Sequence, residues 1–283
     1  MATVTVADHP LTGLGYTEQS SVYPVTRLTA GGETHDSVTV AEEVPIALVY
    51  NGRPYVVVMG TPSDLDDLAV GFSLTEGVVA SASGIRRLDV VRASHGIEIQ
   101  MEIAAADAAR LDERARGMAS RTGCGLCGIE SIADVLRMPE PVLHTLLVPR
   151  DAMWAALDAL SHEQTLNNAT STAHAAGWAT PDGVLRVVRE DVGRHNALDK
   201  VLGALARTEA AASGGFIVIT SRASYEMVQK AALRGIELVA AISRPTGLAI
   251  RLARASGVTL VGLLRGRTAN VHSHPERITR GQS

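Results

Sequence analysis

Short runs of alternating apolar and polar positions in the first hundred residues predict paired strands and a helix. The run "SVTVAEEVPIALVYNGRPYVVVMGTP", from Ser37, predicts two strands joined by a turn at "NGRP". Next, "TPSDLDDLAVGFSLTEGVV" predicts a helix capped by Ser63, with acidic residues in its first turn and Gly77 at its end. A second strand pair, "RRLDVVRASHGIEIQMEI", turns at His-Gly and precedes the helix-forming run "DAARLDERARG".

The second half of the chain alternates strand and helix patterns. An amphipathic helix, "DAMWAALDALSHEQTLNNA", precedes the strands "AHAAGWAT" and "GVLRVVRED", and the helix "HNALDKVLGALAR" follows. The units "FIVITS", "YEMVQKAALRGI", "LVAAIS", "GLAIRLARASG" and "TLVGLLRG" then read as strand, helix, strand, helix and strand. Such alternation predicts an α/β domain with a largely parallel sheet.

These patterns divide the 283 residues into four parts. We expect a disordered tail over 1–24, an N-terminal α+β portion over 25–120, a segment with a loop, a helix and a connector over 121–149, and an α/β domain over 150–283. The net charge of −4 gives no basic excess for nucleic acid or anionic membranes. The apolar runs are shorter than the roughly 20 residues that cross a bilayer, and no signal peptide is evident, so we expect a cytoplasmic protein.

The predicted strands end in segments that combine arginine with small polar residues. These segments are 189–196, 220–225, 243–247 and 265–277. Ligands of open α/β sheets bind beyond the carboxyl ends of the strands, and guanidinium groups with helix N-termini bind phosphate. The pattern predicts a polyphosphate or nucleotide-like ligand, although neither a P-loop nor a GxGxxG motif is present. For any single arginine, a structural role is an equal alternative.

Both cysteines, Cys124 and Cys127, lie in the glycine-rich stretch "RTGCGLCGIES". The stretch suits a nucleophilic thiol on a loop that precedes a helix, since a helix N-terminus and a nearby cation favour the thiolate. A redox dithiol has the same spacing. A structural zinc site would need further cysteines or close histidines. His174 is followed by Ala176 where a zinc deaminase has glutamate, so deaminase chemistry is disfavoured. The remaining alternative is a pair of incidental small residues.

The stretch "REDVGRHNALDK" contains further polar residues that could have either a catalytic or a structural role. Glu190, Asp191, Arg194 and His195 are candidates for acid–base roles, while Asn196 is a candidate helix cap. A structural role for His195 is an equal alternative.

Several long motifs resemble those of the formate dehydrogenase accessory sulfurtransferase family, FdhD. They are "TPSDLDDLAVGFSLTEGVV", "CGLCG", "REDVGRHNALDKVLG", "TSRASYEMVQKAALRGI", "SRPTGLAIRLA" and "NVHSHPERI", and the resemblance runs from about Val25 to Ile278. It implies a cytidine-deaminase-like mixed sheet with flanking helices, without the zinc site, plus a smaller N-terminal α+β portion. It also implies a cytoplasmic homodimer that holds no metal of its own.

The activity implied by the resemblance is sulfur transfer. Such proteins accept persulfide sulfur from a cysteine desulfurase and pass it to the molybdenum (or tungsten) bis(guanine dinucleotide) cofactor, which is then inserted into formate dehydrogenase. Carried over to this chain, Cys124 bears the persulfide and Cys127 is its partner. The candidate cofactor-binding residues are Arg189, Arg194, Ser221, Arg222, Arg244, Thr246, Leu264, Arg265, Gly266, Arg267, Thr268, Ala269 and Asn270.

One position departs from the family pattern, and two other functions compete with sulfur transfer. Ala269 stands where a bulkier, usually aromatic residue is expected. A non-catalytic chaperone that only binds the molybdenum cofactor would tolerate loss of Cys124. A dithiol oxidoreductase would leave the phosphate-suited strand ends unexplained.

Overall fold

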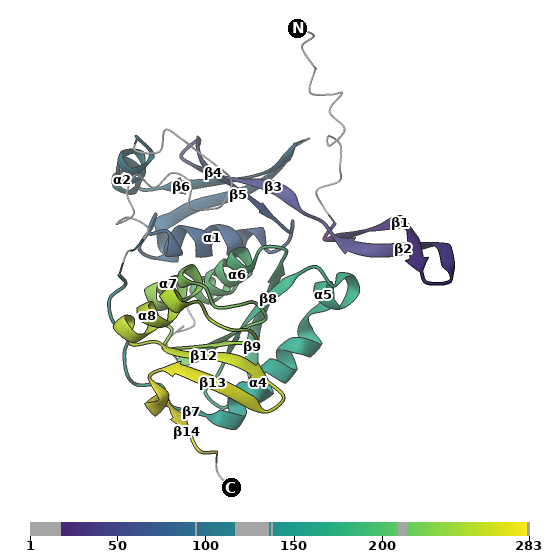
Figure 1. The fold of residues 1–283 in the computed structure, drawn as a ribbon. Helices are drawn as coiled ribbons and strands as arrows, with labels where there is room; N and C mark the ends of the chain where they lie inside the picture. The colour runs from purple at the N-terminus through teal and green to yellow at the C-terminus, as the bar shows by residue number, and fades with distance from the viewer. Residues whose placement is uncertain (1–17, 94, 117–135, 137, 209–213, 282–283) are drawn as a thin grey trace.

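The structure is a computed structural model that describes residues 18–93, 95–116, 136, 138–208 and 214–281. Its N-terminal part contains two antiparallel ribbons, a further strand pair and two helices (Figure 1). Their bounds are β1 (Ser20–Thr29), β2 (Gly32–Ala41), β3 (Val44–Tyr50), β4 (Arg53–Gly60), α1 (Leu65–Thr75), β5 (Ile85–Ala93), β6 (Gly96–Ile103) and α2 (Ala105–Arg116). A 3₁₀ turn, Ala82–Gly84, precedes β5.

The strands β3 to β6 form a four-stranded sheet in the order β4-β3-β6-β5. The predicted turn between β3 and β4 is confirmed at Asn51 and Gly52, which both have positive φ. Apolar side chains on one face of the sheet, including Leu48 and Ile99, pack against Leu68 of α1. The strand residues on this face and the apolar face of α1 together form the N-terminal core.

The C-terminal part begins with a connector and contains a six-stranded sheet between helical layers (Figure 1). Its elements are β7 (Val148–Pro149), α4 (Arg150–Glu163), α5 (Thr165–Thr170), β8 (His174–Ala179), β9 (Leu185–Asp191), α6 (Arg194–Arg207), β10 (Phe216–Ile219), α7 (Tyr225–Leu233), β11 (Leu238–Ala241), α8 (Gly247–Ser256), β12 (Thr259–Arg265), β13 (Thr268–Ser273), a 3₁₀ turn (Pro275–Arg277) and β14 (Ile278–Thr279).

The large sheet has the order β13-β12-β11-β10-β8-β9. The strands β10, β11 and β12 are parallel, as the strand–helix alternation predicts. In contrast, β8 runs antiparallel to both of its neighbours, and β13 folds back on β12. The sheet is therefore mixed, because short connections such as the turn at Gly183 can only return a strand antiparallel to its neighbour. The predicted mixed α/β fold with flanking helices is confirmed.

Both faces of the large sheet are buried. Along β10, Ile217 and Ile219 belong to the core beneath α6, α7 and α8, while Phe216 and Val218 belong to the core beneath α4. Strands that are covered on both faces read as continuous apolar runs, which explains the "FIVIT" pattern.

Helices α1 and α6 join the two parts, and they cross at two glycines. A Cβ atom on Gly71 would lie 1.8 Å from the carbonyl oxygen of Asp199, and one on Gly203 would lie 1.9 Å from that of Asp67. The two backbones therefore touch where any side chain would separate them. Figure 1 shows α1 lying directly on α6, between the two sheets.

Three predicted boundaries differ from the structure. The tail predicted over 1–24 overlaps β1, whose residues from Ser20 onward pair with β2. The helix predicted to be capped by Ser63 instead follows Asp64, which has positive φ and makes no side-chain capping hydrogen bond. The single helix predicted from Asp151 is interrupted at Gln164, where the backbone leaves the helical region between α4 and α5.

No helix among the described residues is long and apolar enough to cross a membrane.

The glycine crossing predicts a strong effect of a single methyl group. We expect Gly71→Ala to lower the free energy of unfolding by about 1–3 kcal/mol, because the added methyl group forces α1 away from α6. Chemical denaturation of the full chain measures this change. Gly247→Ala is the matched control, since its Cβ would meet only Arg251 Nη1 at 3.7 Å. If Gly71→Ala were as stable as the wild type, the backbones of α1 and α6 could not be in contact at Gly71.

Candidate functional site

The carboxyl ends of four strands meet at one edge of the large sheet. β10, β11 and β12 are parallel to one another, and β9 shares their direction because both β9 and β10 run antiparallel to β8. The predicted segments 189–196, 220–225, 243–247 and 265–277 thus begin at a common edge, which we call the carboxyl edge. The helices α6, α7 and α8 all start there.

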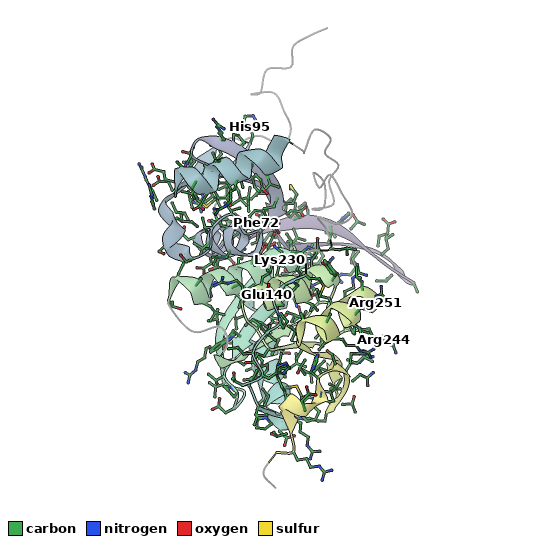
Figure 2. All side chains as sticks on the ribbon, turned by 90° about the vertical axis from the view of Figure 1, so that its left-hand side faces the viewer. Phe72, His95, Glu140, Lys230, Arg244 and Arg251 are labelled. Atoms are coloured by element: carbon green, nitrogen blue, oxygen red, sulfur yellow. The ribbon has the colours of Figure 1, made fainter. Side chains whose placement is uncertain are left out.

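Two arginines at this edge have exposed side chains. Arg222 follows β10 and Arg244 follows β11, and neither forms a salt bridge within the described part of the chain. Figure 2 shows Arg244 at the surface, beside α8. Thr246 is the N-cap of α8, where its Oγ1 accepts a hydrogen bond from the Ala249 N–H at 3.3 Å. Ser221 is buried, and its hydroxyl donates to the Arg222 carbonyl oxygen at 3.2 Å. Exposed, unpaired guanidinium groups remain available to an anionic ligand.

Arg194 and His195 open α6 at the same edge. The buried Nε of Arg194 has no hydrogen-bond partner among the described residues. His195 Nε2 lies 2.7 Å from Glu226 Oε2 in the first turn of α7. The close contact with His195 holds the pKa of Glu226 below its ordinary value, against the effect of burial, although the geometry at the buried Nε2 is not that of a regular hydrogen bond. His174 is also partly buried beside this group, and burial followed by the charge of Arg194 lowers its pKa.

A fully buried ion pair supports the start of α6. Lys200 Nζ lies 2.7 Å from Asp191 Oδ2, and both side chains have an exposed fraction of 0%. The other oxygen, Oδ1, accepts hydrogen bonds from the Gly193 N–H at 2.7 Å and the Asn196 amide at 3.0 Å. The Asp191 carboxylate therefore holds the segment that precedes Arg194 in place, and both of its oxygens are bonded to groups of the protein.

The same ion pair ties the carboxyl edge to the N-terminal part. Asp191 Oδ2 accepts the Thr61 N–H at 3.1 Å, and Lys200 donates to the Thr61 carbonyl oxygen at 3.2 Å. The Asn196 side chain, predicted as a helix cap, instead donates to the Met59 carbonyl oxygen at 2.8 Å. Gly193 is the N-cap residue of α6. The end of β4 and the start of α6 thus form one hydrogen-bonded unit.

Arg189 and Glu190 have structural partners. The Arg189 guanidinium donates to Asp67 Oδ2 at 2.7 and 2.8 Å, and its Nε lies 3.3 Å from Asp64. The Glu190 carboxylate accepts the N–H groups of Leu166 and Asn167, each at 2.8 Å, at the start of α5. The acid–base candidate Glu190 therefore anchors a helix end, and Arg189 links β9 to α1.

The predicted cofactor-binding stretch 264–270 forms the hairpin between β12 and β13. Its turn contains Gly266 and Arg267, which both have positive φ. Leu264 is fully buried in the core beneath α4, and Ala269 packs against the same core. Arg265, Gly266, Arg267, Thr268 and Asn270 are exposed. Leu264 thus points into the protein, at an irregularity in β12 where the register with β13 shifts and Leu263 has positive φ.

Arg267 lies 3.1 Å from Asp158 of α4, in an exposed ion pair. The cysteines Cys124 and Cys127 lie outside the described residues, so their predicted roles stay predictions.

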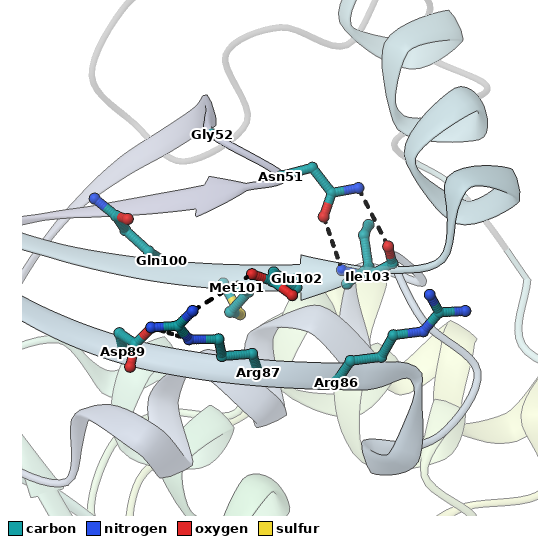
Figure 3. A pocket seen from close by; sticks show the side chains of 9 residues that line it. All are labelled: Asn51, Gly52, Arg86, Arg87, Asp89, Gln100, Met101, Glu102 and Ile103. Atoms are coloured by element: carbon teal, nitrogen blue, oxygen red, sulfur yellow. Dashed lines mark hydrogen bonds and ion pairs between the residues drawn. The ribbon is translucent and has the colours of Figure 1, made fainter.

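A separate cavity of about 430 Å³ lies at the turn of the β3–β4 hairpin (Figure 3). The edge unit contacts the opposite end of that hairpin, at Met59–Thr61. In the cavity, Arg87 pairs with Asp89 at 2.6 Å and with Glu102 at 3.8 Å, and Asn51 hydrogen-bonds the backbone of Ile103. Arg86 also lines the cavity and forms no salt bridge with a described residue, so the cavity holds one unpaired guanidinium group where the carboxyl edge holds two, on Arg222 and Arg244.

The sequence patterns did not identify Glu226 as the partner of His195 at the carboxyl edge. A signal for it exists in the spacing, because His195 and Asp199 on α6 and Glu226 and Lys230 on α7 are both four residues apart. Residues at this spacing lie on the same face of a helix, so two facing helices can form two cross-pairs.

The chain matches known proteins over most of its length. A model of the FdhD/NarQ family matches residues 41–279. A sulfur carrier protein FdhD from Xanthomonas euvesicatoria pv. vesicatoria is 53% identical over 243 residues, which is 86% of each chain. The protein of that name from Bordetella bronchiseptica is 50% identical over 239 residues, covering 84% of this chain and 87% of the relative.

A solved structure is also similar. It is described as that of a formate dehydrogenase accessory protein from Desulfotalea psychrophila, with 28% sequence identity and a TM-score of 0.74. The superposition covers 93% of this chain and all of the other.

The buried pair beneath the edge predicts a large loss of stability on removal of one partner. We expect Lys200→Met to lower the free energy of unfolding by about 3–5 kcal/mol, because it leaves the Asp191 carboxylate buried without its cation. Arg267→Met is the control. It breaks an exposed pair and is expected to cost less than about 1 kcal/mol. Chemical denaturation of both variants measures the two losses. A Lys200→Met protein as stable as Arg267→Met would contradict the stabilising role of Lys200 in the buried pair.

Proposed function

The chain belongs to the FdhD/NarQ family, and from that premise we propose that it is a sulfurtransferase required for formate dehydrogenase activity. The observation that carries the proposal is the 53% identity, over 86% of the chain, to a relative named sulfur carrier protein FdhD. The cysteine pair supports it, because the CxxC spacing provides a second thiol three residues after the first. The donor is a cysteine desulfurase that carries a persulfide.

Two thiols are sufficient to take up the sulfur and release it again. The Cys124 thiolate attacks the outer sulfur of the donor persulfide, the donor S–S bond breaks, and Cys124 becomes the persulfide. The Cys127 thiolate then attacks the Cys124 sulfur and forms a disulfide, and its electron pair releases the outer sulfur as hydrosulfide. A thiol reductant restores the dithiol before the next cycle. In this scheme Cys124 carries the sulfur and Cys127 resolves it.

The acceptor in this proposal is the molybdenum (or tungsten) bis(guanine dinucleotide) cofactor, bound as a substrate. Its pyrophosphate groups suit the exposed guanidinium groups of Arg222 and Arg244 and the neighbouring Arg194. Arg189 would act indirectly, since its guanidinium is held by Asp67. After sulfur transfer the cofactor passes to formate dehydrogenase.

A homodimer is also part of the proposal, on the family resemblance. The projecting ribbon of β1 and β2 supports it, because Val22, Tyr23 and Leu28 have 66%, 43% and 71% of their surface exposed. An isolated two-stranded ribbon is only marginally stable in water, so a covering surface would stabilise it.

The alternative is a chaperone that binds the cofactor without carrying sulfur. The two functions differ in their need for Cys124, and intact mass spectrometry without reductant separates them. After incubation with a cysteine desulfurase and cysteine, we expect the wild type to gain about 32 Da as a persulfide. Cys124→Ala should gain nothing, while Cys127→Ala should retain the adduct. Absence of the adduct from every form, Cys127→Ala included, with an active desulfurase, would support the chaperone instead.

A further inference from the structure

Exposed apolar side chains are concentrated in the connector that leads to β7. Leu136, Met138, Leu143 and Leu147 have 41%, 59%, 64% and 60% of their surface exposed. No other stretch of twelve residues in the described ranges has as many exposed large apolar side chains. A concentration of this kind on a folded surface marks a site that another protein covers. We call these four residues the connector strip.

The connector strip is exposed although the connector itself is anchored in the protein. Residues between and beside its members are buried, since Val142, Leu146 and Val148 have exposed fractions of 6%, 5% and 0%. Val142 belongs to the core beneath α6, α7 and α8, and the other two belong to the core beneath α4. The connector thus lies against the protein surface, with Leu143 and Leu147 on its outer side.

A buried ion pair fixes the backbone of the connector. The Glu237 carboxylate accepts hydrogen bonds from the N–H groups of Thr145 and Leu146 at 3.0 and 3.2 Å. Arg277 Nε lies 3.0 Å from Glu237 Oε2, and Arg277 Nη2 donates to the Leu143 carbonyl oxygen at 2.7 Å. The exposed side-chain fractions of Glu237 and Arg277 are 0% and 2%. The backbone that carries the strip is therefore held in place, which lowers the entropic cost of binding to it.

The connector crosses the edge of the large sheet that is opposite to the carboxyl edge. Glu237 directly precedes β11, and Thr259, which accepts a hydrogen bond from Arg277 at 3.0 Å, opens β12. The Val142 N–H donates to the Ser256 carbonyl oxygen, at the end of α8, at 2.9 Å. Figure 1 shows the connector passing beside α8 on its way to β7. The connector and the exposed arginines of the carboxyl edge therefore lie beyond opposite ends of the same strands.

The two cysteines are tethered to the strip by a short length of chain. Cys127 precedes Met138 by 11 residues. Since a chain extends by at most about 3.6 Å per residue, the backbone of Cys127 lies within about 40 Å of Met138 in any conformation. Of the two partners in sulfur transfer, the acceptor is assigned to the arginines of the carboxyl edge. The strip, whose leucine and methionine side chains suit an apolar protein surface and not a phosphate, is left for the donor.

We propose that the connector strip is the docking surface for the sulfur donor, a cysteine desulfurase that carries a persulfide. The donor binds by burying an apolar surface of its own against the four side chains. The inference rests on the proposed function, because that function supplies the donor. It assigns the donor and the acceptor to opposite edges of the large sheet, so that one does not block the other.

The test compares two sulfur donors on the full chain. One is a cysteine desulfurase with cysteine, and the other is glutathione persulfide, which is too small to need a docking surface. Intact mass spectrometry follows the rate at which the chain gains about 32 Da as a persulfide. Transfer of the outer sulfur from glutathione persulfide to the Cys124 thiolate releases glutathione, so this control reaction needs no further reactant.

The strip variant replaces two leucines, and a matched control replaces an exposed apolar residue elsewhere. In Leu143→Ser/Leu147→Ser we expect the desulfurase concentration at half-maximal loading rate to rise at least about tenfold, because two side chains no longer bury apolar surface. Its maximal rate and its loading from glutathione persulfide should equal those of the wild type. Val57→Ser, at a residue of β4 with 58% of its surface exposed, should match the wild type with both donors. Thermal denaturation checks that each variant is folded.

Three results would overturn the inference. The first is an unchanged half-maximal desulfurase concentration in the double variant. The second is slower loading from glutathione persulfide as well, which would mean that the substitutions affect the thiols and not the docking of the donor. The third is a smaller molecular mass of the double variant in solution, which would make the strip an interface between two copies of the chain.

Failure of the proposed function gives a different pattern. If the wild type gains sulfur from neither donor, the carrier function and the inference both fail. If the wild type gains sulfur from both donors and the double variant behaves in the same way, the carrier function stands and the inference alone is wrong.

Discussion

The close crossing of α1 and α6 at Gly71 and Gly203 is the constraint on which the rest of the structure depends. Contact between two helix backbones leaves no room for side chains, so it fixes both the distance and the register of the N-terminal part on the C-terminal part. Since α6 also covers one face of the large sheet, its position sets where its first turn lies. That turn carries Arg194 and His195, so packing far from the carboxyl edge determines how the edge presents its cations.

Buried ion pairs surround this crossing and favour one relative arrangement of the two helices. Asp67 binds Arg189 and Arg207, Asp191 binds Lys200, and Asp199 binds Lys230. Desolvation offsets much of the attraction within a buried pair, so such pairs contribute less to net stability than to the choice of one arrangement over another. They also divide the arginines of the chain into two kinds. Arg189 holds β9 against α1, whereas Arg222 and Arg244 remain exposed at the edge.

Local patterns in the sequence predict much of the fold but not the partners of its polar residues. The turn at Asn51 and Gly52, the strand–helix alternation and the shared edge follow from periodicity and from the geometry of α/β sheets. The partner of Arg189 does not, because Asp67 lies 122 residues away in the sequence. The same holds for Glu190, which binds the start of α5, and for Asn196, which reaches Met59. Leu264 was a candidate cofactor-binding residue through the family resemblance, and the sequence does not reveal that its side chain is buried in the core beneath α4.

The proposed function joins a thiol that receives and releases sulfur to a cationic edge that holds an anionic acceptor. This function requires phosphate to bind at the carboxyl edge, and hydrogen–deuterium exchange of the full chain with and without GDP is the most direct test. We expect GDP to slow exchange of backbone amides in the segments that follow β9, β10 and β11, with little change around the cavity at Asn51. Protection confined to that cavity, with unchanged exchange at the carboxyl edge, would contradict it.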